Sequence, residues 1–160
     1  MAQLYRDQFV HFVNIATKIG EASDPQWVQE GTGVEALAVS FNPQKDSYKD
    51  ITKRTATTSF NSYQLSSSIS GKRLYDDDEM YAYLDELRKT ATAGETQMIE
   101  VDTASAVSGG NYDAVKYDVL ITITEWLGEN ATISYDIDYS NPVQGSVTIA
   151  DGKPTFVEKM

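Results

Sequence analysis

The sequence predicts a mainly β fold: a β-sandwich with one flanking α-helix and a long β-hairpin or loop arm. Apolar residues alternate with polar ones in several segments, one segment has helical spacing, and one segment is unusually rich in serine and threonine. The chain has 160 residues, which favours a single domain over residues 1–160. A chain of this length buries roughly 68–70% of its unfolded surface, enough for a core without disulfides or metals.

A period of two, which is typical of strands, recurs along the chain. It is clearest over residues 115–125, where one face carries Val115, Tyr117, Val119, Ile121 and Ile123. Shorter alternating segments cover residues 133–139, residues 37–41 before Asn42-Pro43, and residues 147–149 before Asp151-Gly152. Residues 98–101 show the pattern more weakly, and the small residues of 103–110 predict a loop.

One helix is expected, because Met80, Tyr83, Leu84 and Leu87 fall on a single stripe at helical spacing. Four acidic residues, 76–79, precede or open this segment, where they favour the positive end of the helix dipole and can cap free amides. Arg88 and Lys89 stand near its other end, as the dipole favours.

Residues 45–73 do not fit a compact domain. Ten of the 19 residues from 52 to 70 are Ser or Thr, and the segment holds six Lys or Arg against two Asp, a net charge of +4 in a chain of net charge −11. We predict a protruding arm that grips the acidic surface of a neighbouring copy, since complementary potentials fix orientation. The alternative is a flexible polar surface hairpin. The candidate arm residues are Lys53, Arg54, Phe60, Tyr63, Leu65, Ile69, Lys72 and Arg73.

Candidate chemistry is sparse. The chain has no cysteine and one histidine, His11, so zinc sites of His and Cys are excluded by count and any catalytic triad would depend on His11. The pair Asp136 and Asp138 begins like a calcium loop, but Asn141 stands where the turn glycine belongs and Val147 where the bidentate glutamate belongs. We expect no catalytic, metal or cofactor site, and we do not expect an enzyme.

Composition also bears on partners. The acidic balance argues against an exposed nucleic-acid-binding surface, since duplex affinity comes largely from Lys and Arg. No stretch approaches the roughly 18 apolar residues of a membrane span, and we expect neither a membrane segment nor a signal peptide.

The order of several motifs resembles the major tail tube proteins of long-tailed (siphovirus-like) bacteriophages. These motifs cover roughly residues 27–157: Trp27 before Glu30-Gly31, the Ser/Thr-rich arm, the acidic run before the helix, Gly110-x-Tyr112-x-Ala114, Asn141-Pro142-Val143-x-Gly145, and Asp151-Gly152-Lys153-Pro154-Thr155-Phe156. Residues 1–26 carry no motif of the family, and we expect them to form an extra strand or an arm.

The resemblance implies a structural virion protein with a tail-tube-like fold. Six copies would form a ring, and stacked rings would form a tube for double-stranded DNA during ejection, with the arm reaching an adjacent ring. It implies as partners the chain itself and tail terminator, tape-measure and baseplate-type proteins, with DNA passing through without specific binding. It places the protein in the virion tail, after synthesis in the cytoplasm of the host bacterium.

An acidic bore would repel the phosphates of DNA over a Debye length of about 8 Å at physiological salt. By alternation, Asp136, Asp138 and Asp118 lie on polar strand faces and are the candidate lumen residues. The alternative is that these faces meet bulk solvent.

Three other functions remain open at this point. The chain could form the inner tube of a contractile tail or injection device. It could be a monomeric β-sandwich carbohydrate-binding module that uses Trp27 or Trp126, or an enzyme with paired carboxylates.

Overall fold

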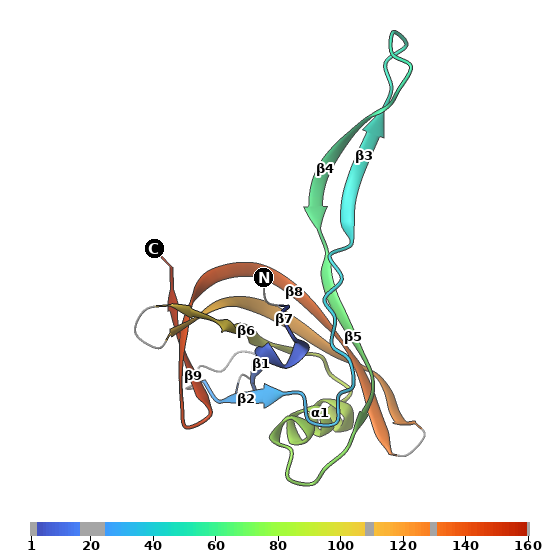
Figure 1. The fold of residues 1–160 in the computed structure, drawn as a ribbon. Coiled ribbons are helices and arrows are strands. Elements are labelled where there is room, and N and C mark those ends of the chain that lie inside the picture. The colour runs from blue at the N-terminus through green and yellow to red at the C-terminus, as the bar shows by residue number, and fades with distance from the viewer. Residues whose placement is uncertain (1–2, 17–24, 108–110, 129–130, 160) are drawn as a thin grey trace.

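The computed structural model describes residues 3–16, 25–107, 111–128 and 131–159 (Figure 1). These residues form a mainly β fold with a single helix, as the sequence predicted. In chain order the elements are the 3-10 turn η1 (Arg6–Gln8), β1 (Phe9–Asn14), β2 (Trp27–Glu30), β3 (Pro43–Tyr48), β4 (Thr57–Tyr63), β5 (Leu65–Arg73), α1 (Glu79–Thr90), β6 (Gly94–Val107), β7 (Asn111–Gly128), β8 (Thr132–Ala150) and β9 (Lys153–Glu158).

Hydrogen bonds join seven strands into one antiparallel, nearly closed sheet in the order β2-β1-β6-β7-β8-β5, with β9 also paired to β8. The far edge of β8 is shared, because β5 pairs with its first half and β9 with its second half. The layers expected of a sandwich are thus parts of one strongly curved sheet (Figure 1). β3 and β4 form a separate two-stranded hairpin.

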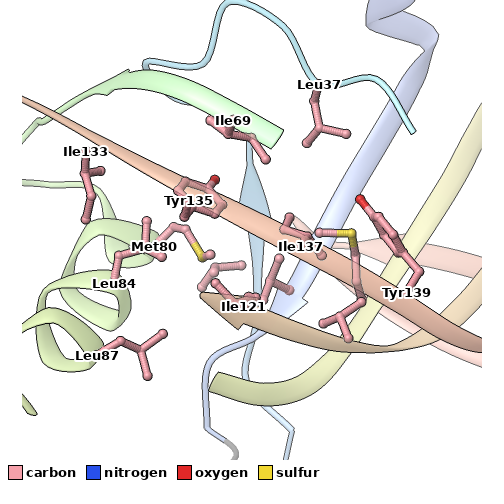
Figure 2. Packing of buried hydrophobic residues seen from close by; sticks show 14 residues of the cluster. Leu37, Ile69, Met80, Leu84, Leu87, Ile121, Ile133, Tyr135, Ile137 and Tyr139 are labelled. Carbon is pink, nitrogen blue, oxygen red and sulfur yellow. The ribbon is translucent and has the colours of Figure 1, made fainter. Parts of the chain in front are cut away.

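The larger core lies between the sheet and α1. Met80, Leu84 and Leu87 of the helix are buried against Ile121 of β7 and Ile137 of β8 (Figure 2). The helical stripe predicted from the sequence is therefore confirmed, and it covers one face of the sheet. Asp78 caps the helix by accepting a hydrogen bond from the Met80 amide, as its place before the apolar stripe predicted.

A smaller core lies on the opposite face. Neighbouring residues of β1 divide between the two, with Val13 in the larger core and Phe12 in the smaller one. Phe156 of β9 packs against the smaller core. α1 therefore covers one face of the curved sheet, and the smaller core lies on the other face.

β8 is longer than the sequence predicted, because the segments expected at 133–139 and 147–149 belong to one strand of 19 residues. The register with β7 shifts between Lys116 and Asp118, where Asn141 and Pro142 of β8 stand against one residue of β7. Asn141 has a positive φ of 51° there. This bulge changes which alternate residues of β8 face which core.

Two local predictions were wrong. Residues 37–41 form no strand and make only an isolated bridge between Ser40 and Ser66, because Leu37 is buried in the larger core beside the sheet rather than within it. Of the loop predicted at 103–110, residues 103–107 continue β6 after a register shift that follows Asp102, and residues 108–110 lie outside the described residues. In residues 1–26, β1 is an inner strand, and residues 17–24 lie outside the described residues.

Candidate functional site

The hairpin of β3 and β4 stands away from the rest of the molecule (Figure 1). Every residue of both strands is exposed. Its two strands are tied by backbone pairing and by side-chain contacts such as Asn61 Nδ2 donating to Asp46 Oδ2 at 2.7 Å. An isolated two-stranded hairpin is marginally stable in water at best. The hairpin therefore gains little stability from burial of its own residues.

Aromatic rings gather at the base of the hairpin. Tyr63 packs edge-on against Phe41, with ring centroids 5.3 Å apart, and lies 4.7 Å from Phe60. All three rings are still about half exposed. Contacts of this kind stabilise the hairpin, and about half of each ring is exposed to solvent.

The charge of the hairpin is smaller than that of the predicted arm. Between residues 43 and 63 it carries Lys45, Lys49, Lys53 and Arg54 against Asp46 and Asp50, a net charge of +2. Lys53 and Arg54 lie near the tip and are exposed. Lys53 lies 3.4 Å from Asp50, an exposed pair of a kind that contributes little to stability.

The structure places the second half of the predicted arm in the body. β5 belongs to the main sheet, with Leu65 opposite Tyr139 of β8 and Ile69 buried in the larger core. Arg73 is exposed and pairs with Glu35 of the same chain at 3.3 Å. The protruding segment is therefore residues 43–63. Ile69 and Lys72 are buried in the body, and Arg73 is exposed but lies outside the protruding segment.

Lys72 is fully buried and neutralised within its own chain. Its Nζ lies 2.7 Å from Glu30 Oε1 and 2.9 Å from Asp78 Oδ2, and it donates to the Thr32 carbonyl at 2.7 Å. These partners lie on β2, before α1, and in the loop after β2. Lys72 therefore fastens β5 to two other parts of the fold.

This cluster perturbs the protonation of its neighbours. Burial raises the pKa of Glu30 above its ordinary value, although attraction to Lys72 acts in the opposite direction. Burial, followed by the nearby Glu30 charge, raises the pKa of Tyr135 well above its ordinary value. The geometry is that of a structural ion-pair cluster closed within the core.

The candidate lumen residues share one face of the sheet. Asp118 and Asp138 are exposed and Asp136 is half-buried. Asp136 stands opposite Thr122 of β7 and Ser68 of β5, and Asp138 stands between Leu120 and Ser66. By strand alternation this face is the one away from α1, so alternation placed the three carboxylates correctly on one side.

A fourth carboxylate, Glu95 of β6, joins this face and was missed at the sequence level. It is exposed and stands opposite Leu120. Asp118 is held in place, since Asn141 Nδ2 donates to its Oδ2 at 2.9 Å. We name Glu95, Asp118, Asp136 and Asp138 the acidic face. Glu95 lay just outside the weak strand pattern at 98–101, and only the register of β6 against β7 places it here.

His11 is a core residue. Only 5% of it is exposed, and Arg6 Nη2 lies 3.2 Å from its Nε2. Burial, and secondarily the positive charge of Arg6, lowers the pKa of His11 to about 4. A cavity of about 230 Å³ adjoins it, lined also by Glu100 and Tyr117. No described serine is hydrogen-bonded to His11, so the described residues contain no Ser-His pair of the kind a triad requires.

The two tryptophans do not form an exposed platform. Trp27 packs against the smaller core and Trp126 against the larger one. The guanidinium of Arg88 lies 4.0 Å from the centroid of the Trp126 ring. Within the described residues no group of three His, Asp or Glu side chains could hold a metal, and none of their helices is long and apolar enough to span a membrane.

Comparisons with known proteins find only distant likeness in fold, among solved structures. No protein-family model matches the chain, and no curated protein matches it. Among solved structures, a chain of the anti-feeding prophage (AFP) baseplate, determined by cryo-EM with 6-fold symmetrisation, is similar with 8% identity and a TM-score of 0.47. The match covers 90% of this chain and 95% of that chain. A likeness this distant assigns no function.

Proposed function

We propose that this chain is a structural subunit of a phage-tail-type tube, built from stacked rings of identical copies. The observation that carries the proposal is the exposed hairpin at residues 43–63. It projects from the body at the end away from α1 (Figure 1). A projection at one end that binds a different surface at the other end is a heterologous contact, which gives open filaments when repeated along an axis.

The energetics of the hairpin favour a role in assembly. A free hairpin of this length gains little from burial, yet it exposes Phe60 and Tyr63. Covering these rings with another copy would remove apolar surface from water at roughly 25 cal/mol per Å². The residual charge of +2 on the hairpin suits a body that carries the remaining −13 of the chain.

The acidic face gives the tube a conduit function. We place Asp118, Asp136, Asp138 and Glu95 toward the bore, where they would repel the phosphates of passing double-stranded DNA. The resemblance seen in the sequence supports six copies in each ring and a long, non-contractile tail in the virion. The same subunit geometry suits the inner tube of a contractile tail or injection device, and binding of a sheath protein to the outside of the tube would decide between them.

The test compares the full chain with a variant in which Pro43–Tyr63 is replaced by Gly-Gly. Gln64 donates its amide hydrogen to the Phe41 carbonyl at 2.9 Å, so a short connection can close the base of the hairpin. Electron microscopy and sedimentation at increasing concentration should show tubes for the full chain and folded monomers for the variant. Tubes from the variant, or a full chain that remains monomeric at its highest soluble concentration, would contradict the proposal.

A further inference from the structure

The tip of the hairpin exposes an isoleucine that the turn itself does not require. The Lys53 amide donates to the Asp50 carbonyl at 3.1 Å, which closes a turn with Ile51 and Thr52 at its centre. Gly, Pro, Asn, Asp and Ser are the usual residues of such turns. Ile51 is fully exposed, at the far end of a projection and away from either core. Exposed Lys49, Lys53 and Arg54 surround it in sequence.

A groove of matching character lies along α1. Its volume is about 470 Å³, and its apolar lining includes Ile15, Ala82, Tyr83 and Leu87. Gly94 lies in its floor, where any added Cβ would overlap the Tyr83 hydroxyl. Glu79 and Glu86 of the helix also line it, and no described lysine or arginine does.

We propose that this groove on α1 receives the hairpin tip of a second copy, with Ile51 in the apolar floor and the tip cations against Glu79 and Glu86. The inference rests on the proposed function, and it names the surface that the hairpin binds. Charge complementarity favours this groove over its neighbour along the helix, where Arg88 and Glu125 offset each other and the Arg88 guanidinium would lie against the cationic tip.

The positions of the two parts agree with a head-to-tail contact. In Figure 1 the hairpin tip and α1 lie at opposite ends of the molecule. The tip cannot reach the groove of its own chain in this arrangement, but a copy displaced along the same direction presents its α1 to it. Each added subunit then contributes one tip and one groove, and the contact repeats without closing.

Ile51→Ser tests the apolar part of the contact, with Thr52→Ser at the adjacent turn position as the matched control. Because each added subunit makes one tip contact, the loss of one buried isoleucine should raise the concentration needed for tubes by about 30-fold. Ala82→Trp should block the groove, and Ala38→Trp, at an exposed alanine outside it, should not. Assembly that tolerates both Ile51→Ser and Ala82→Trp would overturn the inference.

Disulfide trapping separates this inference from the proposed function. The chain has no cysteine, so Ile51→Cys together with Thr90→Cys introduces the only two thiols. Mild oxidation of assembled tubes should give a ladder of covalent oligomers, and Ala38→Cys in place of Thr90→Cys should not. Tubes that form but give no ladder would overturn the groove assignment and leave the proposed function standing.

A charge exchange covers the case in which the cysteine variant does not assemble. Glu79→Lys with Glu86→Lys should abolish assembly, and the addition of Lys53→Glu with Arg54→Glu in the same chain should restore it. Circular dichroism should first establish that each variant is folded. Failure of the exchange to restore tubes from folded protein would overturn the inference, whereas failure of the wild-type chain to assemble would contradict the proposed function itself.

Discussion

Replacement of Lys72 by methionine should destabilise the fold more than any change at an exposed cation. Methionine keeps most of the length of the side chain but leaves Glu30 and Asp78 without the charge that lies 2.7 and 2.9 Å from them. Removing one partner of a buried ion pair costs about 3–5 kcal/mol, because the remaining charge is buried and unpaired. For a chain of this size, that cost corresponds to a fall in melting temperature of roughly 6–20 °C.

The matched control is the next residue. Arg73→Met removes an exposed pair with Glu35 at 3.3 Å, for which about 0–1 kcal/mol is expected. Urea unfolding followed by tryptophan fluorescence would give both values. The double variant Glu30→Gln with Lys72→Met should recover part of the loss, because it removes one of the two unpaired carboxylates together with the lysine.

The dependence on pH gives a second readout. The pKa of Glu30 is raised in the folded state, so the folded state binds more protons than the unfolded state between the ordinary and the raised value. Stability from this group is therefore present at low pH and is lost as pH rises through that interval. Without Lys72 the pKa of Glu30 rises further and the interval widens upward. The loss of unfolding free energy caused by Lys72→Met should thus be smaller at pH 5 than at pH 8. A loss of unfolding free energy at pH 8 below about 1 kcal/mol, or a loss that grows on acidification, would refute the reasoning.

Three other predictions follow from single sites. Gly33→Ala should cost at least about 1–3 kcal/mol in thermal unfolding, because Gly33 has a φ of 76° and a Cβ there would overlap the Arg73 carbonyl. His11 has its pKa lowered to about 4, so its own contribution to stability should fall by about 3 kcal/mol as pH drops from 6.5 to 4, and an NMR titration of this single histidine should show a midpoint near 4. Asp136→Lys with Asp138→Lys should leave tubes intact but slow DNA ejection; normal ejection from assembled tails would count against the lumen assignment.

Elements with local signals could be predicted from the sequence. α1 was predictable because its stripe and its cap, Asp78, lie within one short segment. β7 was predictable for the same reason, because its long alternation lies within one continuous segment. The segment at residues 37–41 alternates too, but whether such a short segment joins a sheet depends on a neighbouring strand edge. Here β5 is the end strand of the sheet, and the segment meets its open edge only at Ser40.

The candidate site was only partly predictable, because the charge of a side chain does not show whether the fold buries it. Lys53 and Lys72 both belong to the cationic segment at 45–73, yet one is exposed near a hairpin tip and the other is buried. The partners of Lys72 are Glu30 and Asp78, and the separation of 42 residues from Glu30 leaves no local pattern. The opposite case is the acidic face, where alternation alone placed Asp136 and Asp138 on one side of β8.

These placements join the arm to the rest of the subunit in a specific way. The hairpin continues directly into β5, and Lys72 near the end of β5 holds Asp78, the residue that caps α1. The groove proposed to receive the next copy's tip lies on that same helix. A tip bound at α1 of one copy is therefore connected through Asp78 and Lys72 to the hairpin of that copy, which reaches the following one. It follows that the Lys72→Met chain, folded at low temperature, should form tubes that break more easily under shear than tubes of the Arg73→Met chain. Equal breakage of the two would show that mechanical load passes between copies by another route.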